Sequence, residues 1–182
     1  MQIQKEAVRR KILAAAEEEF LRAGFHRASV RRIAAAAGVA AGNIYAYFPS
    51  KAALFDAVVA PALEAVRRLF GLDGSGSLEA MSGWIADAFL AAQASFRVLM
   101  ERAEGTRYEG TRERLVASAA RKIQQEHLKG FPSDLQTPFF AEAMAGAVIG
   151  GMFQLLQGYN GDEAVFRRSV EGLVGVLFRS FY

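Results

Sequence analysis

Residues 29–51 read SVRRIAAAAGVAAGNIYAYFPSK, and the spacing of glycine and apolar residues in this stretch predicts the fold of the first part of the chain. Ser29 is a good N-cap, and the apolar residues after it recur at helical spacing, so a short helix that ends at Gly38 is predicted. A second short helix is expected over 41–48. Two short helices joined by a tight glycine turn make a helix-turn-helix, whose second helix enters the major groove of DNA.

The second of these helices commits little of its surface to a core. Apart from Ile44, residues 41–47 offer small side chains, one asparagine and two tyrosines. Gly42 costs about 1 kcal/mol of helix propensity relative to alanine. A weak helix of this kind is easier to explain if its outer face is used, because small residues let a helix approach base edges closely.

Positive charge is concentrated in the same part of the chain. The net charge of the whole chain is +3, but residues 1–51 hold nine Lys/Arg and four Glu, a balance of +5. Cations in the first turn of a helix oppose its dipole unless an external anion, such as a phosphate, compensates them. An ordinary solvated basic face is the alternative reading. The basic residues in first turns are Arg9, Arg10, Lys11, Arg31, Arg32 and Lys51.

The whole chain reads as helical, so the predicted fold class is all-α. Alanine is abundant, only four prolines occur, and alternating β-branched runs are absent. Gly24 is expected to be a left-handed cap, Pro61 to kink or break its helix, and GLDGSGS at 71–77 to form a loop. The remaining helices are predicted over residues 5–23, 51–70, 78–93, 95–104, 111–129, 139–157 and 163–181.

The composition argues against several classes of protein. The chain has no cysteine and only two histidines, His26 and His127, so disulfides, thiolate nucleophiles and cysteine-ligated zinc are excluded. No catalytic triad, phosphate loop or metal-ligand spacing occurs, so neither an enzyme nor a cofactor or metal is expected. No run of about 18 uncharged apolar residues and no signal-peptide core is present, so a cytoplasmic protein without membrane contact is expected.

Over residues 10–55 the sequence resembles the DNA-binding domain of TetR-type repressors. Many fixed spacings agree over this region, which makes the resemblance specific. The matching residues are Ile12 to Ala16, Phe20, Gly24, Phe25, Ser29, Val30, Ile33, Ala34, Ala37 to Val39, Ile44, Tyr45, Tyr47, Phe48, Ser50, Lys51, Leu54 and Phe55.

The resemblance implies an all-α homodimer with a helix-turn-helix head, residues 1–51, on a ligand-binding and dimerisation body, residues 52–182. It also implies double-stranded DNA with a palindromic operator as partner. Carried over by position, Ser29, Tyr45, Tyr47 and Lys51 would contact phosphates, Ala41, Gly42, Asn43 and Ala46 would face the groove, and Arg31 and Arg32 would lie at its edge.

Some readings of these residues stay open at this point. Tyr45 and Tyr47 could be packed aromatics, Asn43 could be a solvated helix residue, and Arg32 could pair with a nearby glutamate. The sequence also departs from the family, which often has serine at the position of Ala40. The recognition helix therefore lacks its usual N-cap, at a cost of about 1 kcal/mol.

The resemblance is weak in the body, which is rich in aromatic residues. As a group, these residues suggest a cavity for an apolar or aromatic small-molecule effector, although plain core is the alternative for each. The candidate ligand-binding residues are Trp84, Phe89, Phe96, Met100, Tyr108, Phe140 and Met144.

The last two predicted helices carry small residues beside apolar ones, a pattern that suits a two-fold four-helix interface. Packing within one chain is the alternative. The candidate dimerisation residues are Gly146, Gly150, Phe153, Val170, Val174 and Phe178. The function predicted from the sequence is a repressor released from its operator by an effector; the alternative is a DNA-binding regulator whose body docks a protein partner.

Overall fold

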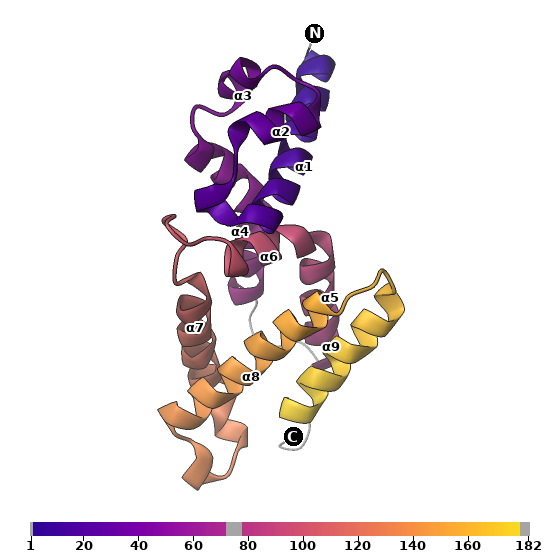
Figure 1. Ribbon diagram of the computed structural model, residues 1–182. Coiled ribbons are helices and arrows are strands. Elements are labelled where there is room, and N and C mark those ends of the chain that lie inside the picture. Colours follow the sequence, from indigo (N-terminus) through magenta and orange to yellow (C-terminus); the bar gives the residue numbers. More distant parts are fainter. Residues whose placement is uncertain (1, 72–77, 179–182) are drawn as a thin grey trace. The chain divides into compact units, whose positions relative to one another are not determined.

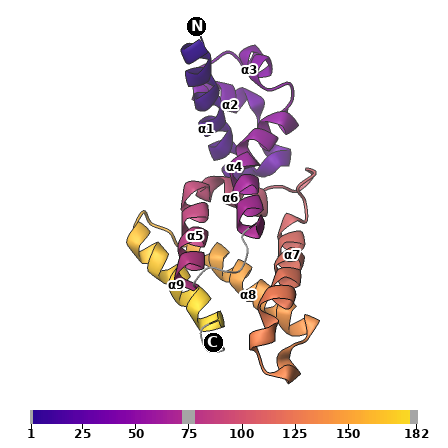
Figure 2. The same ribbon diagram turned by 180° about the vertical axis from the view of Figure 1, so that it is seen from behind.

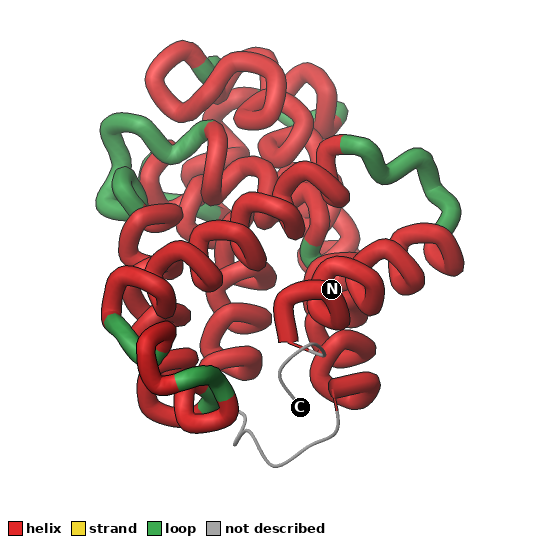
Figure 3. The backbone as a smooth tube through the Cα atoms, turned by 90° about the horizontal axis from the view of Figure 1, so that it is seen from below, coloured by secondary structure: helices red, strands yellow, loops and turns green. Residues whose placement is uncertain are grey.

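The computed structural model describes residues 2–71 and 78–178, and in these ranges every regular element is a helix (Figure 1 and Figure 3). Most of the loop predicted at 71–77, and the end of the helix predicted to reach residue 181, lie outside the described residues. The elements are α1 Gln2–Arg27, α2 Val30–Ala37, α3 Ala41–Tyr47, α4 Lys51–Gly71, α5 Leu78–Ala91, α6 Gln93–Glu101, α7 Thr111–Glu126, the 3₁₀ turns Leu128–Gly130 and Ser133–Leu135, α8 Pro138–Gln157 and α9 Glu163–Phe178.

The chain divides into two compact units. The first contains α1, α2, α3, α4 as far as Leu63, and the segment Ala92–Glu109 with α6; the second contains the end of α4 with α5, α7, α8 and α9. The structural boundary therefore falls within α4, two residues after Pro61. The functional division at residue 51 is a separate matter and stays a prediction.

The core of the first unit forms where α1 packs on α2 and α6. Phe20 is fully buried, and its ring meets the edge of Phe55 at 5.0 Å between centroids. The α6 helix is tied to α4 by the Ser95 hydroxyl, which donates a buried hydrogen bond of 2.8 Å to the Val58 carbonyl. Pro61 does not end α4, which continues to Gly71.

Gly24 has a positive φ, as expected, but not the left-handed cap that the sequence predicts. Its φ is 70° and its ψ is 167°, a combination open essentially only to glycine. The helix bends there and continues to Arg27. The expectation was wrong because the backbone after Gly24 returns to helical geometry, and the carbonyl of Gly24 still accepts a hydrogen bond from the Ala28 N–H.

The second unit is built around α8, which packs against α7 and α9, while α9 also packs against α5 (Figure 1 and Figure 2). Thr137 caps α8 by accepting a hydrogen bond from the Phe140 N–H, and Pro138 occupies the first turn. Gly151 lets α8 approach α9, because a Cβ there would lie 2.7 Å from the Leu173 side chain. By length and composition α8 is the one helix among the described residues that could also cross a membrane, and one third of its apolar window is buried within the fold.

Candidate nucleic-acid interface

The helix predicted to enter the groove presents an almost bare outer face. Ile44 is the only buried residue of α3, and Phe48 closes its end in the core. The small residues and Asn43 are exposed, and so is Tyr45, at 54%, whereas Tyr47 is half-buried. An exposure of 54% leaves Tyr45 free to reach a partner. The exposed small residues are Ala41, Gly42 and Ala46.

The turn before α3 forms as the sequence predicts. Gly38 adopts the left-handed conformation, with φ 69° and ψ 33°, and closes α2 by donating its N–H to backbone carbonyls of that helix. Ala40 then precedes α3 in an extended conformation, with no side-chain hydrogen bond to the helix. As expected, α3 therefore has no side-chain N-cap. It is held by packing through Ile44 and by the backbone hydrogen bond from the Asn43 N–H to the Ala40 carbonyl.

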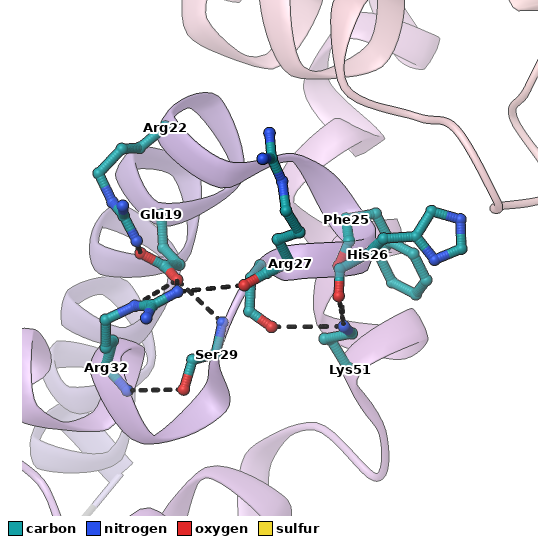
Figure 4. Close-up of polar contacts among 9 residues, drawn as sticks. Glu19, Arg22, Phe25, His26, Arg27, Ser29, Arg32 and Lys51 are labelled. Atoms are coloured by element: carbon teal, nitrogen blue, oxygen red, sulfur yellow. Dashed lines mark hydrogen bonds and ion pairs between the residues drawn. The ribbon is translucent and has the colours of Figure 1, made fainter.

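A buried glutamate organises the start of α2, and the sequence reasoning did not find it (Figure 4). Glu19 is only 7% exposed. Its Oε1 accepts hydrogen bonds from the Ser29 N–H, at 2.9 Å, and from Arg32 Nε, at 2.8 Å. Its Oε2 accepts one from Arg22 Nη2 at 2.6 Å. The available signal was its spacing, since Glu19 follows Ala16 by three residues on the buried face of α1.

The charge on this carboxylate is fixed by its donors. Burial raises the pKa of Glu19, but the hydrogen bonds from Arg32, Arg22 and the Ser29 N–H outweigh it and lower the pKa to about 2. Glu19 is therefore ionised throughout the neutral range. Ser29 also caps α2 as predicted, because its hydroxyl accepts a hydrogen bond from the Arg32 N–H at 3.4 Å.

Two of the cations predicted to face DNA, Arg32 and Lys51, have partners inside the first unit. Arg32 takes the alternative that the sequence left open, since it pairs with Glu19 and also donates to the Arg27 carbonyl. It still exposes 55% of its side chain, so a DNA contact stays a prediction. Arg31 is exposed.

Lys51 has all three of its ammonium donors engaged (Figure 4). They bond to the carbonyls of Phe25, His26 and Ala28 at 2.8, 3.2 and 3.3 Å, and the ammonium lies 4.6 Å from the centre of the Phe25 ring. Lys51 thus satisfies carbonyls at the end of α1. A direct phosphate contact, which stays a prediction, would need one of these bonds to be exchanged.

The seven candidate ligand-binding residues belong to different compact units. Phe96, Met100 and Tyr108 lie in the first, and Trp84, Phe89, Phe140 and Met144 in the second. Phe96, Phe89 and Met144 are buried, whereas Trp84 is 54% exposed. Their role in binding an effector stays a prediction.

Four of the six candidate dimerisation residues, Phe153, Val170, Val174 and Phe178, are buried within the fold of one chain. Their role in dimerisation stays a prediction. The apolar periodicity marked the inner faces of α8 and α9. The two glycines, Gly146 and Gly150, are only half-buried.

Comparison with known proteins finds a family model that matches the head of the chain. Residues 12–58 match the model of the family described as bacterial regulatory proteins, tetR family. No curated protein sequence matches the chain.

Similar solved structures extend the comparison to the body. NalD, the secondary repressor of the MexAB-OprM multidrug efflux pump in Pseudomonas aeruginosa, is 26% identical, with a TM-score of 0.65 and 96% of each chain covered. A TetR-like transcriptional regulator from Rhodococcus sp. RHA1 shares the fold, with a TM-score of 0.66, 23% identity, and coverage of 95% of this chain and 94% of that chain.

Proposed function

We propose that this chain is a TetR-family transcriptional regulator, a homodimeric, cytoplasmic repressor which an apolar or aromatic small molecule releases from a palindromic operator. The observation that carries the proposal is the outer face of α3, which is exposed, small and backed by Ile44. A face of this shape suits close approach to the major groove.

The proposed contacts divide into those that position the head and those that read sequence. Asn43 is the one side chain on the exposed small face with both a donor and an acceptor for base edges. Tyr45, Tyr47 and Ser29 supply hydroxyls for phosphates, and Arg31 supplies charge. With so few base-reading groups, part of the specificity would come from the shape of the operator.

Release by an effector requires a link from the body to the head, and α6 supports this role because it packs with the head in one compact unit. The Phe25 N–H donates to the Arg102 carbonyl at 3.2 Å. Farther along the same segment, Arg107 pairs with Asp56 of α4 at 3.0 Å. An effector that shifted α6 would therefore pull on both α1 and α4, and so change the population of DNA-binding conformations.

Dimerisation is typical of the family, and we place its surface on the outer faces of α8 and α9. Along α8 the exposed or half-buried residues at positions 143, 147, 150 and 154 form one stripe, mostly of alanine and glycine. On α9, Val176 is 75% exposed and Val165 is 47% exposed, on the side opposite buried Val174. Small residues beside exposed valines suit close helix packing between two copies.

The effector hypothesis is tested with duplexes selected by the wild-type protein from a random pool. A library of apolar and aromatic compounds is screened by fluorescence anisotropy for release of the labelled duplex. We expect a compound class that lowers DNA affinity at least about tenfold while raising the melting temperature, since a ligand that binds the folded state stabilises it. Operator binding that no compound changes would contradict an effector-released repressor.

The dimer surface is tested separately by sedimentation. The wild-type chain is expected to sediment with twice the mass of one chain, and Ala147→Glu, which adds a charge to the α8 stripe, is expected to sediment as a monomer. Ala117→Glu, at an exposed position of α7, is the matched control and should remain dimeric. If the Ala147→Glu variant remains dimeric, the α8 stripe is not the dimer interface.

A further inference from the structure

Two exposed arginines from different helices meet at one buried carboxylate in the head (Figure 4). Arg22 comes from α1 and Arg32 from the first turn of α2; they expose 59% and 55% of their side chains, while Glu19 exposes 7%. Arg22 takes Oε2 and Arg32 takes Oε1, at 2.6 and 2.7 Å. The carboxylate therefore fixes both guanidinium groups at a single place on the surface of the head.

The cluster has donors and charge left over. Two guanidinium groups and one carboxylate carry a net charge of +1. Arg22 uses Nε and Nη2 toward Glu19, and Arg32 uses Nε and Nη2 toward Glu19 and the Arg27 carbonyl. In the described part of the chain the Nη1 groups of both arginines have no hydrogen-bond acceptor. Each Nη1 group carries two N–H donors, in the fork geometry that suits an anion with several oxygens.

The cluster also lies beside the N-terminal end of α2. Arg32 and Arg31 add positive charge where the helix dipole is already positive, and of these residues only Arg32 is matched by Glu19. The Ser29 hydroxyl, one of the proposed phosphate contacts, is hydrogen-bonded to the Arg32 N–H. An anion drawn to Ser29 would therefore meet the arginine pair directly.

We propose that Arg22 and Arg32 together bind a backbone phosphate of the operator, and that Glu19 is the positioning residue that holds them in place. This inference rests on the proposed DNA-binding function. It extends the interface to α1, beyond the helix-turn-helix, and it gives the buried carboxylate a role in binding. Because the guanidinium groups are held before DNA arrives, little side-chain entropy is lost on binding.

The role of Glu19 can be separated from simple charge. Removal of a negative charge from a DNA-binding head ordinarily strengthens binding, because repulsion from the phosphates falls. If Glu19 positions the arginines, Glu19→Gln instead weakens binding. Glu18→Gln is the matched control, since Glu18 is the neighbouring carboxylate on α1 and is exposed.

The experiment measures the affinity for the selected duplex, and its salt dependence, by fluorescence anisotropy. Arg22→Gln is compared with Arg68→Gln, an exposed arginine of α4 that likewise pairs with a glutamate of its own helix, Glu64. We expect Arg22→Gln to weaken binding about three- to tenfold and to reduce the slope of log affinity against log salt by about 1 for each head, whereas Arg68→Gln changes neither. We also expect Glu19→Gln to weaken binding by at least about threefold and Glu18→Gln to leave it unchanged or stronger.

The outcomes separate this inference from the proposed function. A wild-type protein that binds no duplex would overturn the DNA-binding function itself. If the wild type binds but Arg22→Gln matches Arg68→Gln in affinity and slope, the phosphate site is refuted while the function stands. If Glu19→Gln strengthens binding as much as Glu18→Gln, the positioning role is refuted. Arg22 is exposed, so its variant remains informative even if Glu19→Gln fails to fold.

Discussion

Gly105, in the segment that follows α6, packs directly against the ring of His26 in the head. Gly105 has φ +75°, and a Cβ added there would lie less than 3.0 Å from three atoms of that ring. Gly105→Ala therefore meets two penalties, the strain of a left-handed backbone and the displacement of the ring. Left-handed strain costs about 1–2 kcal/mol, partly offset by a less flexible unfolded chain.

The second penalty is set by how easily the ring can move. His26 is exposed, so the ring can rotate away, but it then loses its edge contact with Phe25, whose centroid is 6.1 Å away. Such contacts are worth about 0.5–1.5 kcal/mol. We expect Gly105→Ala to lower the free energy of unfolding by about 2 kcal/mol in all.

Urea unfolding followed by far-UV circular dichroism measures this, with Gly110→Ala as the matched control. Gly110 has φ +72°, but its nearest neighbour would lie 3.4 Å away, so its variant should lose only about 1 kcal/mol. In the double variant His26→Ala/Gly105→Ala the ring is absent. Relative to His26→Ala alone, we expect its loss of unfolding free energy to shrink toward that of Gly110→Ala. Equal losses for the two glycine variants, with no rescue by His26→Ala, would refute the packing of Gly105 on His26.

Three further predictions concern the stability of single elements. Ala40→Ser supplies the N-cap that α3 lacks and should stabilise the protein by about 1 kcal/mol, measured as a rise in melting temperature of about 2–4 °C that Ala36→Ser does not share. Because the pKa of Glu19 is lowered to about 2, wild type should have a higher free energy of unfolding than Glu19→Gln. This difference should be full above pH 4.5, at most about 3 kcal/mol, and should disappear as the pH falls toward 2; a difference independent of pH would contradict the prediction. Gly151→Ala sets an overlap with Leu173 of about 1–3 kcal/mol against a gain of about 1 kcal/mol in helix propensity, so it should cost at most about 2 kcal/mol in urea unfolding, and Leu173→Ala in the same chain should recover part of the overlap.

The local features of the head could be predicted because each depends on a short stretch of sequence. Ser29 caps α2, Gly38 adopts the left-handed turn, and Ile44 anchors α3. Each of these residues lies within ten residues of the helix that it caps, ends or anchors. The missing N-cap of α3 could be predicted in the same way, because Ala40 has no polar side chain to accept a hydrogen bond from the helix.

The interactions that could not be predicted join distant positions or depend on direction. Glu19 meets the Ser29 N–H ten residues away, and Lys51 meets carbonyls more than twenty residues away, so neither contact has a local signal. In the body, periodicity identified the apolar faces of α8 and α9 but not whether they meet their own chain or another. Val170 and Val174 proved to be internal, whereas Val176 is exposed.

In the proposed function, α3 and the basic head read a specific operator as part of a symmetric dimer. The most direct test is to select duplexes from a random pool with the wild-type protein and with Asn43→Ala, and to sequence the bound fraction. Wild type should enrich an inverted repeat whose half-sites face the same side of the duplex, and Asn43→Ala should relax the preference at one position in each half-site. A bound pool with no enriched sequence, or one enriched identically by the two proteins, would contradict the claim.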